Sequence, residues 1–415
     1  MSEREHAGLL FTPCLVTPTG DGPKRGPALA SPRVITDAAM AWRDGLVTYA
    51  GPAAGLPEDL RPGDPAAVHR VGGSVVPGFV DCHTHLPFVG WRADEFEARL
   101  TGRTYRDLQG QGGGIFRSSR LLRDATDDEV MAFCLPLAAE MAAHGTTAVE
   151  LKTGYGLSVE DELRQARLAR RLASEIPQTA GVTLLACHAV PEGMTREGWV
   201  DAVCGELIPS AAADRLADAV DVYVEDIAFS VEDLQRVAEA ALQHGLRLRC
   251  HADQLGPSGA AEAAVRAGAR SADHLNHVSD AGVAALGDAE TAAVLLPTST
   301  LFIRAERPPV GSLLAAGAAV TLATDFNPGT SPCLSMPEVI ATAAALYRIP
   351  PLTALTATTA NPAWVLGMDD RLGSLEPGKR ADFVVLDTED PAMIAYRPGH
   401  DPVTQTWIGG ALAQR

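Results

Sequence analysis

The chain has 415 residues, 46% of them hydrophobic, and its 52 Asp and Glu side chains outnumber its 34 Lys and Arg side chains, so that the net charge is −18. This length allows a large core and more than one domain, whereas the acidic balance argues against a surface for nucleic acid or for an anionic membrane. A small anionic substrate would need arginine close to its binding site.

The seven cysteines are scattered, odd in number and without Cys-x-x-Cys spacing, which favours a reduced protein. The N-terminus lacks a basic region followed by an apolar core, and no window approaches the roughly 18 uninterrupted apolar residues of a membrane span. We therefore expect a cytoplasmic enzyme with no membrane anchor. A homodimer is possible.

Both ends of the chain have the composition of short strands separated by turns. The expected strands cover residues 9–11, 39–42, 46–51 and 75–76 near the N-terminus, and 383–387 and 403–408 near the C-terminus. A segment rich in Pro and Gly, residues 20–32, is expected to be a mobile loop. We predict that residues 1–77 and 369–415 together build one small β-domain, a β-sandwich.

Between these ends, apolar strands alternate with helical stretches, which is typical of a parallel sheet. The expected strands cover residues 78–85, 145–151, 182–188, 220–225, 246–251, 271–275, 292–297 and 319–325. Eight is the strand number of a (β/α)8 barrel. We therefore predict an α/β fold in which a TIM-like (β/α)8 barrel spans residues 78–368.

The first of these strands ends in His83-Thr84-His85. Because side chains alternate along a strand, the two imidazoles are expected to point the same way. Catalytic groups of such a barrel lie at the carboxyl ends of its strands, and other expected strands also end in polar residues. These residues are His188, His251, His274 and Asp325.

This set of side chains predicts a metal-assisted hydrolase. Two facing histidines, the histidine of the fifth strand and the aspartate of the eighth would hold one divalent metal ion, zinc or iron, with a position left for water. Such an ion lowers the pKa of its water towards about 7. Asp325 could accept a proton and pass it to a leaving nitrogen, while His188 and His274 polarise the substrate. The expected reaction cleaves a C–N bond.

An ordered set of motifs is similar to that of the imidazolonepropionase family, within the metal-dependent amidohydrolase superfamily. The motifs are residues 77–85, 92–97, 112–115, 150–157, 188–191, 271–275, 323–329 and 378–383, with the His251 strand end. The resemblance implies hydrolysis of the cyclic amide of 4-imidazolone-5-propanoate to N-formimino-L-glutamate, a step of histidine degradation.

Carried over by position, the resemblance also implies the roles of individual residues. The metal ligands would be His83, His85, His251 and Asp325, and the substrate would be surrounded by Arg92, Tyr105, Tyr155 and His188. Arg92 lies seven residues past His85, in the loop expected over the barrel mouth. A guanidinium grips a carboxylate through two parallel bonds, so Arg92 is the expected partner of the propanoate. Asn327 and Gly329 could add hydrogen bonds.

Gln254 stands three residues past His251, where some family members carry a glutamate thought to contact the attacking water. Glutamine can position a water molecule but cannot accept its proton. Asp325 or His274 would then act as the base, with Gln254 assisting. Three glycines, at 112–114, lack the Lys-Ser/Thr of a phosphate loop and are expected to form a lid.

Other departures from the family pattern leave the substrate open. Trp91, Thr298 and residues 116–122 differ from the expected pattern and are expected near the mouth. The alternative function is therefore a related amidohydrolase or deaminase that acts on another cyclic amide, amidine or nucleobase. A metal-free, non-catalytic scaffold is disfavoured because the full set of ligand residues is present.

A second metal ion is also considered and disfavoured. Lys152 could carry a bridging carbamate, but it follows the second expected strand, whereas the fourth ends in Glu225-Asp226. A bridging role for Glu225 is less favoured than a structural one. One metal ion per chain is expected.

Overall fold

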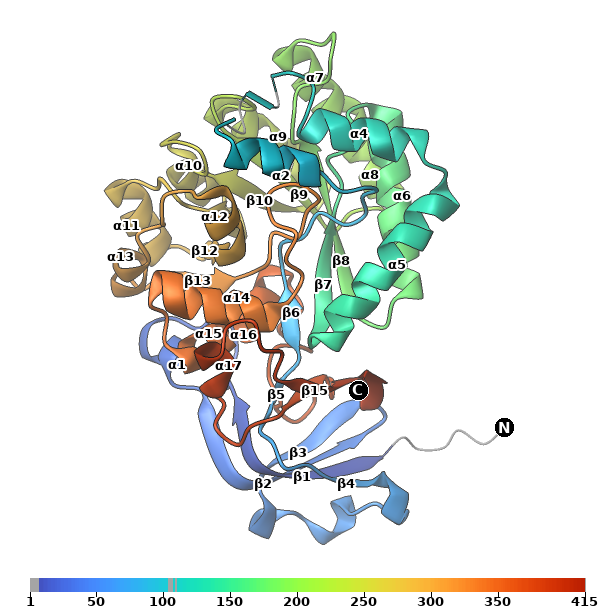
Figure 1. Cartoon of the computed structure of the whole chain (residues 1–415), viewed down its shortest axis with the longest axis vertical. Coiled ribbons are helices and arrows are strands. Elements are labelled where there is room, and N and C mark those ends of the chain that lie inside the picture. Colours follow the sequence, from blue (N-terminus) through green and yellow to red (C-terminus); the bar gives the residue numbers. More distant parts are fainter. Residues whose placement is uncertain (1–6, 104–106, 109, 415) are drawn as a thin grey trace.

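The computed structural model describes residues 7–414 except 104–106 and 109, and it contains two sheets (Figure 1). The barrel sheet has eight parallel strands that pair in chain order. They are β6 (Phe79–Asp81), β7 (Thr146–Lys152), β8 (Thr179–Cys187), β9 (Ala219–Val224), β10 (Arg247–Ala252), β11 (Ser271–His274), β12 (Ala292–Leu295) and β13 (Ala319–Leu322). The predicted α/β barrel and the order of its strands are confirmed.

The expected ends of the first and last barrel strands are wrong. β6 stops at Asp81 and β13 at Leu322, so His85 and Asp325 lie past the strands rather than on them. The chain stays extended there because the two segments bond to each other: the Asp325 amide donates to the His83 carbonyl over 3.0 Å, and the His85 amide donates to the Phe326 carbonyl over 2.8 Å. This seam closes the barrel.

Helices surround the barrel strands in the upper part of Figure 1. They are α2 (Ala93–Leu100), α4 (Ile115–Asp124), α5 (Asp127–Ala143), α6 (Val159–Glu175), α7 (Arg196–Ala202), α8 (Ile208–Ala213), α9 (Val231–Gln243), α10 (Ala260–Arg266), α11 (Asp280–Asp288), α12 (Pro297–Ile303), α13 (Val310–Ala315), α14 (Met336–Thr342), α15 (Pro351–Ala357) and α16 (Ala360–Val365). Side-chain caps fix several helix starts: the Thr126 and Ser230 hydroxyls accept bonds from the amides of Glu129 and Asp233.

The second sheet, in the lower part of Figure 1, joins both ends of the chain. Its strands are β1 (Gly8–Thr17), β2 (Arg33–Arg43), β3 (Leu46–Pro52), β4 (Val68–Arg70), β5 (Val75–Pro77), β14 (Phe383–Leu386), β15 (Val403–Ile408) and β16 (Ala411–Gln414). Strand β5 pairs with β1 on one side and with β14 on the other. The expected participation of both chain ends in one small β-domain is confirmed, and the rings of Trp42, Phe383 and Trp407 pack in its core.

Two connections complete this part of the chain. The predicted loop over residues 20–32 contains the short helix α1 (Gly26–Ala30), which begins with a proline in its first turn, and α17 (Met393–Tyr396) lies between β14 and β15. In the part of the chain that the structure describes, no helix is long and apolar enough to cross a membrane.

Asn361, in α16, ties the N-terminal segment to the barrel. Its amide oxygen accepts from the Lys24 amide over 2.6 Å, and its amide nitrogen donates to the carbonyls of Lys24 and Val320 over 3.0 and 2.7 Å. The side chain is fully buried. Three backbone groups therefore depend on one amide for their hydrogen bonds.

We predict that Asn361→Ala lowers the free energy of unfolding by about 3 kcal/mol, because it leaves buried polar groups without partners. Urea denaturation followed by circular dichroism measures the change. Thr404→Ala is the matched control, since it removes one hydrogen bond to the Val385 carbonyl at an exposed position and should change the free energy by less than about 0.5 kcal/mol. Equal effects of the two substitutions would contradict the role given to Asn361.

Candidate active site

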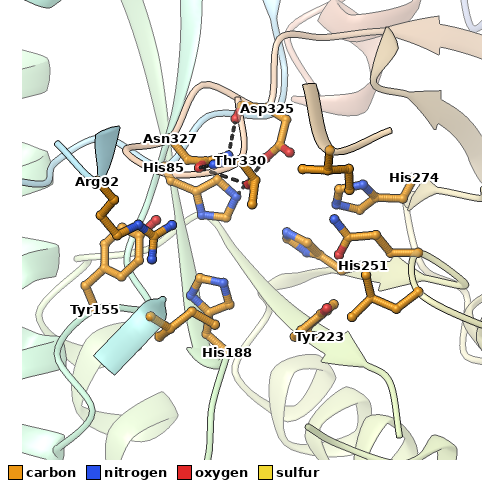
Figure 2. Close-up of a pocket in the computed structure, with 14 residues that line it drawn as sticks. His85, Arg92, Tyr155, His188, Tyr223, His251, His274, Asp325, Asn327 and Thr330 are labelled. Carbon is orange, nitrogen blue, oxygen red and sulfur yellow. Dashed lines mark hydrogen bonds and ion pairs between the residues drawn. The ribbon is translucent and has the colours of Figure 1, made fainter. Parts of the chain in front are cut away.

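A pocket lies at the carboxyl end of the barrel strands (Figure 2). It is lined by His85, Arg92, Ile115, Tyr155, His188, Tyr223, His251, Gln254, Leu255, His274, Ile303, Asp325, Asn327 and Thr330. Nine of these are candidate residues from the sequence. His83 is fully buried, and Tyr105, the remaining aromatic candidate, lies outside the described residues.

Five of the candidates form a compact cluster of donor atoms. The ring nitrogens of His83, His85 and His251 approach one another within 4.8 Å, and so do donor atoms of His83, His274 and Asp325. Asp325 Oδ1 lies 3.2 Å from His85 Nε2 and 3.6 Å from His83 Nε2. Three imidazoles and a carboxylate in such proximity are a ligand set suited to one zinc or iron ion.

Carboxylates behind two of these imidazoles fix their tautomers. His83 Nδ1 donates to Asp273 over 2.6 Å, and His251 Nδ1 donates to Asp221 over 3.1 Å. The Nε2 atom of each ring then carries a free lone pair. Both Nε2 atoms are buried without a hydrogen-bond partner among the described residues. A histidine held this way is typical of a metal ligand, because the carboxylate orients the ring and raises its basicity.

The two carboxylates belong to a buried ionic network beneath the histidines. Lys152 Nζ lies 2.8 Å from both Glu150 and Asp221. Arg249 contacts Glu150, lies 2.9 Å from Asp273, and donates to the Cys82 carbonyl over 2.6 Å. All five ionisable side chains are buried. The network thereby connects the histidine cluster to the backbone that leads into it.

Burial keeps the imidazoles of His83, His85 and His274 neutral. Burial lowers the pKa of His83 and His85 well below the usual range, with Lys152 adding to the effect. Burial also lowers the pKa of His274 to about 3. Although burial alone would raise it, the positive charge of Lys152 and the hydrogen bond from His251 hold the pKa of Asp221 well below its ordinary value. The carboxylate behind His251 is therefore ionised.

Arg92 is positioned for an anion. It is 3% exposed, and its Nε and Nη1 atoms have no hydrogen-bond partner among the described residues. Glu95 lies 3.7 Å from Nε, too far for a hydrogen bond. A buried guanidinium with unused donors is costly unless a ligand completes its bonds. In Figure 2, Arg92 and Tyr155 lie at the opposite end of the pocket from His274.

The loop after β13 supports Arg92 from behind. A Cβ atom at Gly329 would overlap the Arg92 guanidinium, so glycine is needed for this close approach. The Arg92 amide donates to the Pro328 carbonyl over 3.0 Å. Asn327 Oδ1 accepts from the amides of Gly329 and Thr330 over 2.9 and 2.7 Å. These contacts favour positioning roles for Asn327 and Gly329 over direct hydrogen bonds to a ligand.

Aromatic and amide side chains complete the wall. The His188 ring stacks on His85 with a centroid distance of 5.3 Å, and its Nδ1 donates to the Gly154 carbonyl over 3.0 Å. Tyr155 packs beside His188 at 5.5 Å. Gln254 faces the pocket, while its backbone amide donates to Glu225 over 2.6 Å. The candidate substrate contacts within the described residues therefore face one pocket or directly support it.

Glu225 and Lys152 have structural contacts here. Glu225 Oε1 accepts bonds from the amides of Gln254 and Leu255, and burial raises its pKa to about 7. Lys152 is enclosed by its two carboxylate partners. These contacts support the prediction that Glu225 has a structural role, and they support the expectation of one metal ion.

Two site residues have a left-handed backbone, with φ of 79° at His274 and 56° at Asp325. This conformation is unfavourable for residues other than glycine and persists where surrounding contacts over-determine it. At Asp325 two hydrogen bonds provide those contacts. The Asp325 amide donates to the His83 carbonyl, and Asn327 Nδ2 donates to the Asp325 carbonyl over 2.6 Å. The turn directs the carboxylate toward the histidines.

The three departures expected near the mouth do not line the pocket. Trp91 is 40% exposed and packs in an aromatic cluster with Phe88, Phe133 and Phe326. Thr298 is buried, and its hydroxyl donates to the Thr324 carbonyl over 3.1 Å. Residues 116–122 belong to α4, of which only the preceding Ile115 reaches the pocket. None of these positions therefore supplies a wall residue of the pocket.

Sequence reasoning missed several residues around the site. Asp221 and Asp273 orient histidines, and Tyr223 lines the pocket. Strand alternation could have found them, because Asp221 and Tyr223 share one face of β9 and Asp273 shares the face of Ser271 on β11. The pocket-lining residues Ile115, Leu255, Ile303 and Thr330 come from helices and loops, for which no such signal exists.

The chain is similar to proteins of a known family. The model of the amidohydrolase family matches residues 74–413. The imidazolonepropionase of Rhizorhabdus wittichii is 43% identical over 381 residues, which cover 91% of this chain and 94% of the relative. The imidazolonepropionase of Rubrobacter xylanophilus is 42% identical over 399 residues, which cover 96% of both chains.

Solved structures share the fold at lower identity. A triazine hydrolase variant superimposes with a TM-score of 0.77 and 16% identity, covering 98% of this chain and 94% of that one. An adenosine deaminase from Xanthomonas campestris, solved with bound zinc, gives a TM-score of 0.70 and 21% identity over 97% and 92% of the two chains. At such identities the likeness concerns the fold alone.

We predict that Asp273→Asn weakens zinc binding about 10- to 100-fold, because His83 loses its charged hydrogen-bond partner. Competition with a chromogenic chelator measures the affinity. Asp382→Asn is the matched control. Asp382 is also a buried carboxylate, but it lies beside the second sheet, where it accepts hydrogen bonds from Arg380 and Gly409. Equal zinc affinities of the two variants would contradict the orienting role of Asp273.

Proposed function

The chain belongs to the imidazolonepropionase family of amidohydrolases, and from this premise we propose that it hydrolyses the cyclic amide of 4-imidazolone-5-propanoate to N-formimino-L-glutamate, in histidine degradation. The observation that carries the proposal is the placement of Arg92. Its buried, incompletely bonded guanidinium faces the same pocket as the histidine–aspartate cluster. That arrangement suits a substrate with a carboxylate at one end and a hydrolysable C–N bond at the other.

We propose one divalent ion, zinc or iron, held by His83, His85, His251 and Asp325. Two observations support the fit: the ring nitrogens and the carboxylate lie close together, and two Nε2 atoms are buried without partners among the described residues. An ion held there would supply Lewis acidity, because it polarises a carbonyl and makes water more acidic.

The protein's own groups would bind the substrate and move the protons. Arg92 would bind the propanoate carboxylate, with Tyr155 and His188 against the ring. Water adds to the ring carbonyl carbon while Asp325 accepts its proton. The same proton then passes to the ring nitrogen as the C–N bond breaks, so that one water is consumed and nothing is released. His274 would hydrogen-bond the developing oxyanion, and Gln254 would position the attacking water.

The same proposal covers the charge of the substrate and the cellular compartment of the reaction. The substrate is a small anion, and Arg92 supplies positive charge in the pocket of a chain whose net charge is −18. All seven cysteines are free thiols, which supports function in a reducing compartment, the cytoplasm.

The test is turnover of 4-imidazolone-5-propanoate by the purified protein. The proposal predicts loss of the substrate's ultraviolet absorbance with formation of N-formimino-L-glutamate and no release of ammonia. An inactive protein that instead releases ammonia from a nucleobase would replace this proposal with a deaminase function.

We predict that Arg92→Met raises KM about 30- to 300-fold while the metal content stays unchanged, because the carboxylate loses a charge-assisted, two-pronged partner. Steady-state kinetics and elemental analysis measure the two effects. Arg92→Lys keeps the charge but not the fork, and its KM should lie between those of the wild type and Arg92→Met. Parallel loss of metal and of substrate binding would show that Arg92 supports the fold instead.

Removal of the metal ion gives a separate prediction. Dialysis against a strong chelator should abolish turnover and lower the melting temperature, because an ion that binds only the folded state stabilises it. Adding back zinc or iron should restore both. Full turnover by protein shown by elemental analysis to be metal-free would contradict the hydrolytic role of the cluster.

A further inference from the structure

A second cavity adjoins the active-site pocket. Gln254, Leu255 and Ile303 line both cavities, so the same side chains form the partition between them. The second cavity is bounded mainly by α2 and by the end of α12. It therefore lies directly outside the pocket that contains Arg92.

Among the described residues, the charged side chains that line the second cavity are arginines. Arg99, Arg103 and Arg304 line it together with His277 and apolar side chains, and no Asp or Glu is present among its described lining residues. Arg103 and Arg304 are exposed to solvent. The Glu306 carboxylate lies 3.3 Å from His277. Such a gathering of positive charge contrasts with the net charge of −18 for the whole chain.

Arg99, in the wall of this cavity, contacts the loop that supports Arg92. Arg99 Nη2 donates to the Gly329 carbonyl over 2.8 Å, and Gly329 packs directly behind the Arg92 guanidinium. The Arg99 guanidinium also lies 5.2 Å from the centre of the Phe302 ring, on which Phe96 stacks at 4.4 Å. Helix α2 thus carries Arg92 at its start and Arg99 in its last turn, which places positive charge at both cavities.

We propose that this second cavity is a vestibule that collects the carboxylate-bearing substrate and guides it to Arg92. The inference rests on the proposed function. The negative field of the protein repels an anion, whereas a concave surface lined by one sign of charge raises the local concentration of the opposite ion and its association rate. Exposed arginines hold an anion only weakly because water screens them, so the substrate can move on to the buried guanidinium.

Arg304 is the residue with which to test the vestibule, because its side chain is exposed and lies away from the histidine cluster. Arg304→Glu should lower kcat/KM at least about threefold at low ionic strength, mainly through KM. The loss should shrink as salt is added, since salt screens exposed charges. Arg304→Lys keeps the charge and should behave like the wild type.

Arg43→Glu is the matched control. It makes the same change in net charge at an exposed position of β2, in the sheet that lies at the far end of the molecule from α2 in Figure 1. This variant should retain the wild-type kcat/KM. Equal values for Arg304→Glu and Arg43→Glu at low salt would overturn the vestibule, as would a loss that salt does not change.

The two proposals fail in different ways. If wild-type protein does not hydrolyse 4-imidazolone-5-propanoate, the proposed function fails. If the wild type does hydrolyse it but the Arg304 and Arg43 variants have the same kinetics, only the vestibule fails. A loss in Arg304→Lys as large as that in Arg304→Glu would assign the effect to packing and would also overturn the electrostatic role.

Discussion

Five buried charges beneath the histidines impose the strongest constraint on this structure. Glu150, Lys152, Asp221, Arg249 and Asp273 are withdrawn from water, and removing even one partner from such a set leaves an uncompensated charge that costs about 3–5 kcal/mol. Two cations face three carboxylates, which leaves one negative charge, and Asp325 adds another nearby. A divalent cation would balance both. The network therefore suits a metal ion electrostatically as well as geometrically.

The closure of the barrel depends on the same region. Residues 82–85 and 323–326 bond to each other past the ends of β6 and β13, and Asp81 accepts two bonds from Thr324, the shorter of 2.6 Å. Arg249 adds a bond to the Cys82 carbonyl from below. The residues that join the first and last strands are therefore also those that carry or precede the ligand side chains. A disturbance of the seam would displace ligands from two segments together.

Much of this arrangement could be predicted from the sequence, because apolar strands at regular intervals define a barrel and polar residues at their ends stand out. The ends of β6 and β13 could not be predicted, since the extended conformation of residues 82–85 depends on bonds to a segment about 240 residues away. The position of Trp91 could not be predicted either, because its packing depends on Phe133, in α5. Strand alternation also places Arg249 with His251, and Glu150 with Lys152, on shared strand faces.

The loops after the first and last strands also set the distance between the anchor and the reacting centre. Arg92 follows His85 in one loop, and Gly329 follows Asp325 in the other. The two loops are locked together by the bond from the Arg92 amide to the Pro328 carbonyl and by the bond from Arg99 to the Gly329 carbonyl. The backbone of Arg92 therefore cannot move toward or away from Asp325 without breaking these bonds. A site with a fixed separation between an anion anchor and a hydrolytic centre selects acids of one length, because misplacement by even about 1 Å is costly to catalysis. Specificity for a propanoate side chain would then arise from the two loops that carry the anchor and the carboxylate, and not from Trp91.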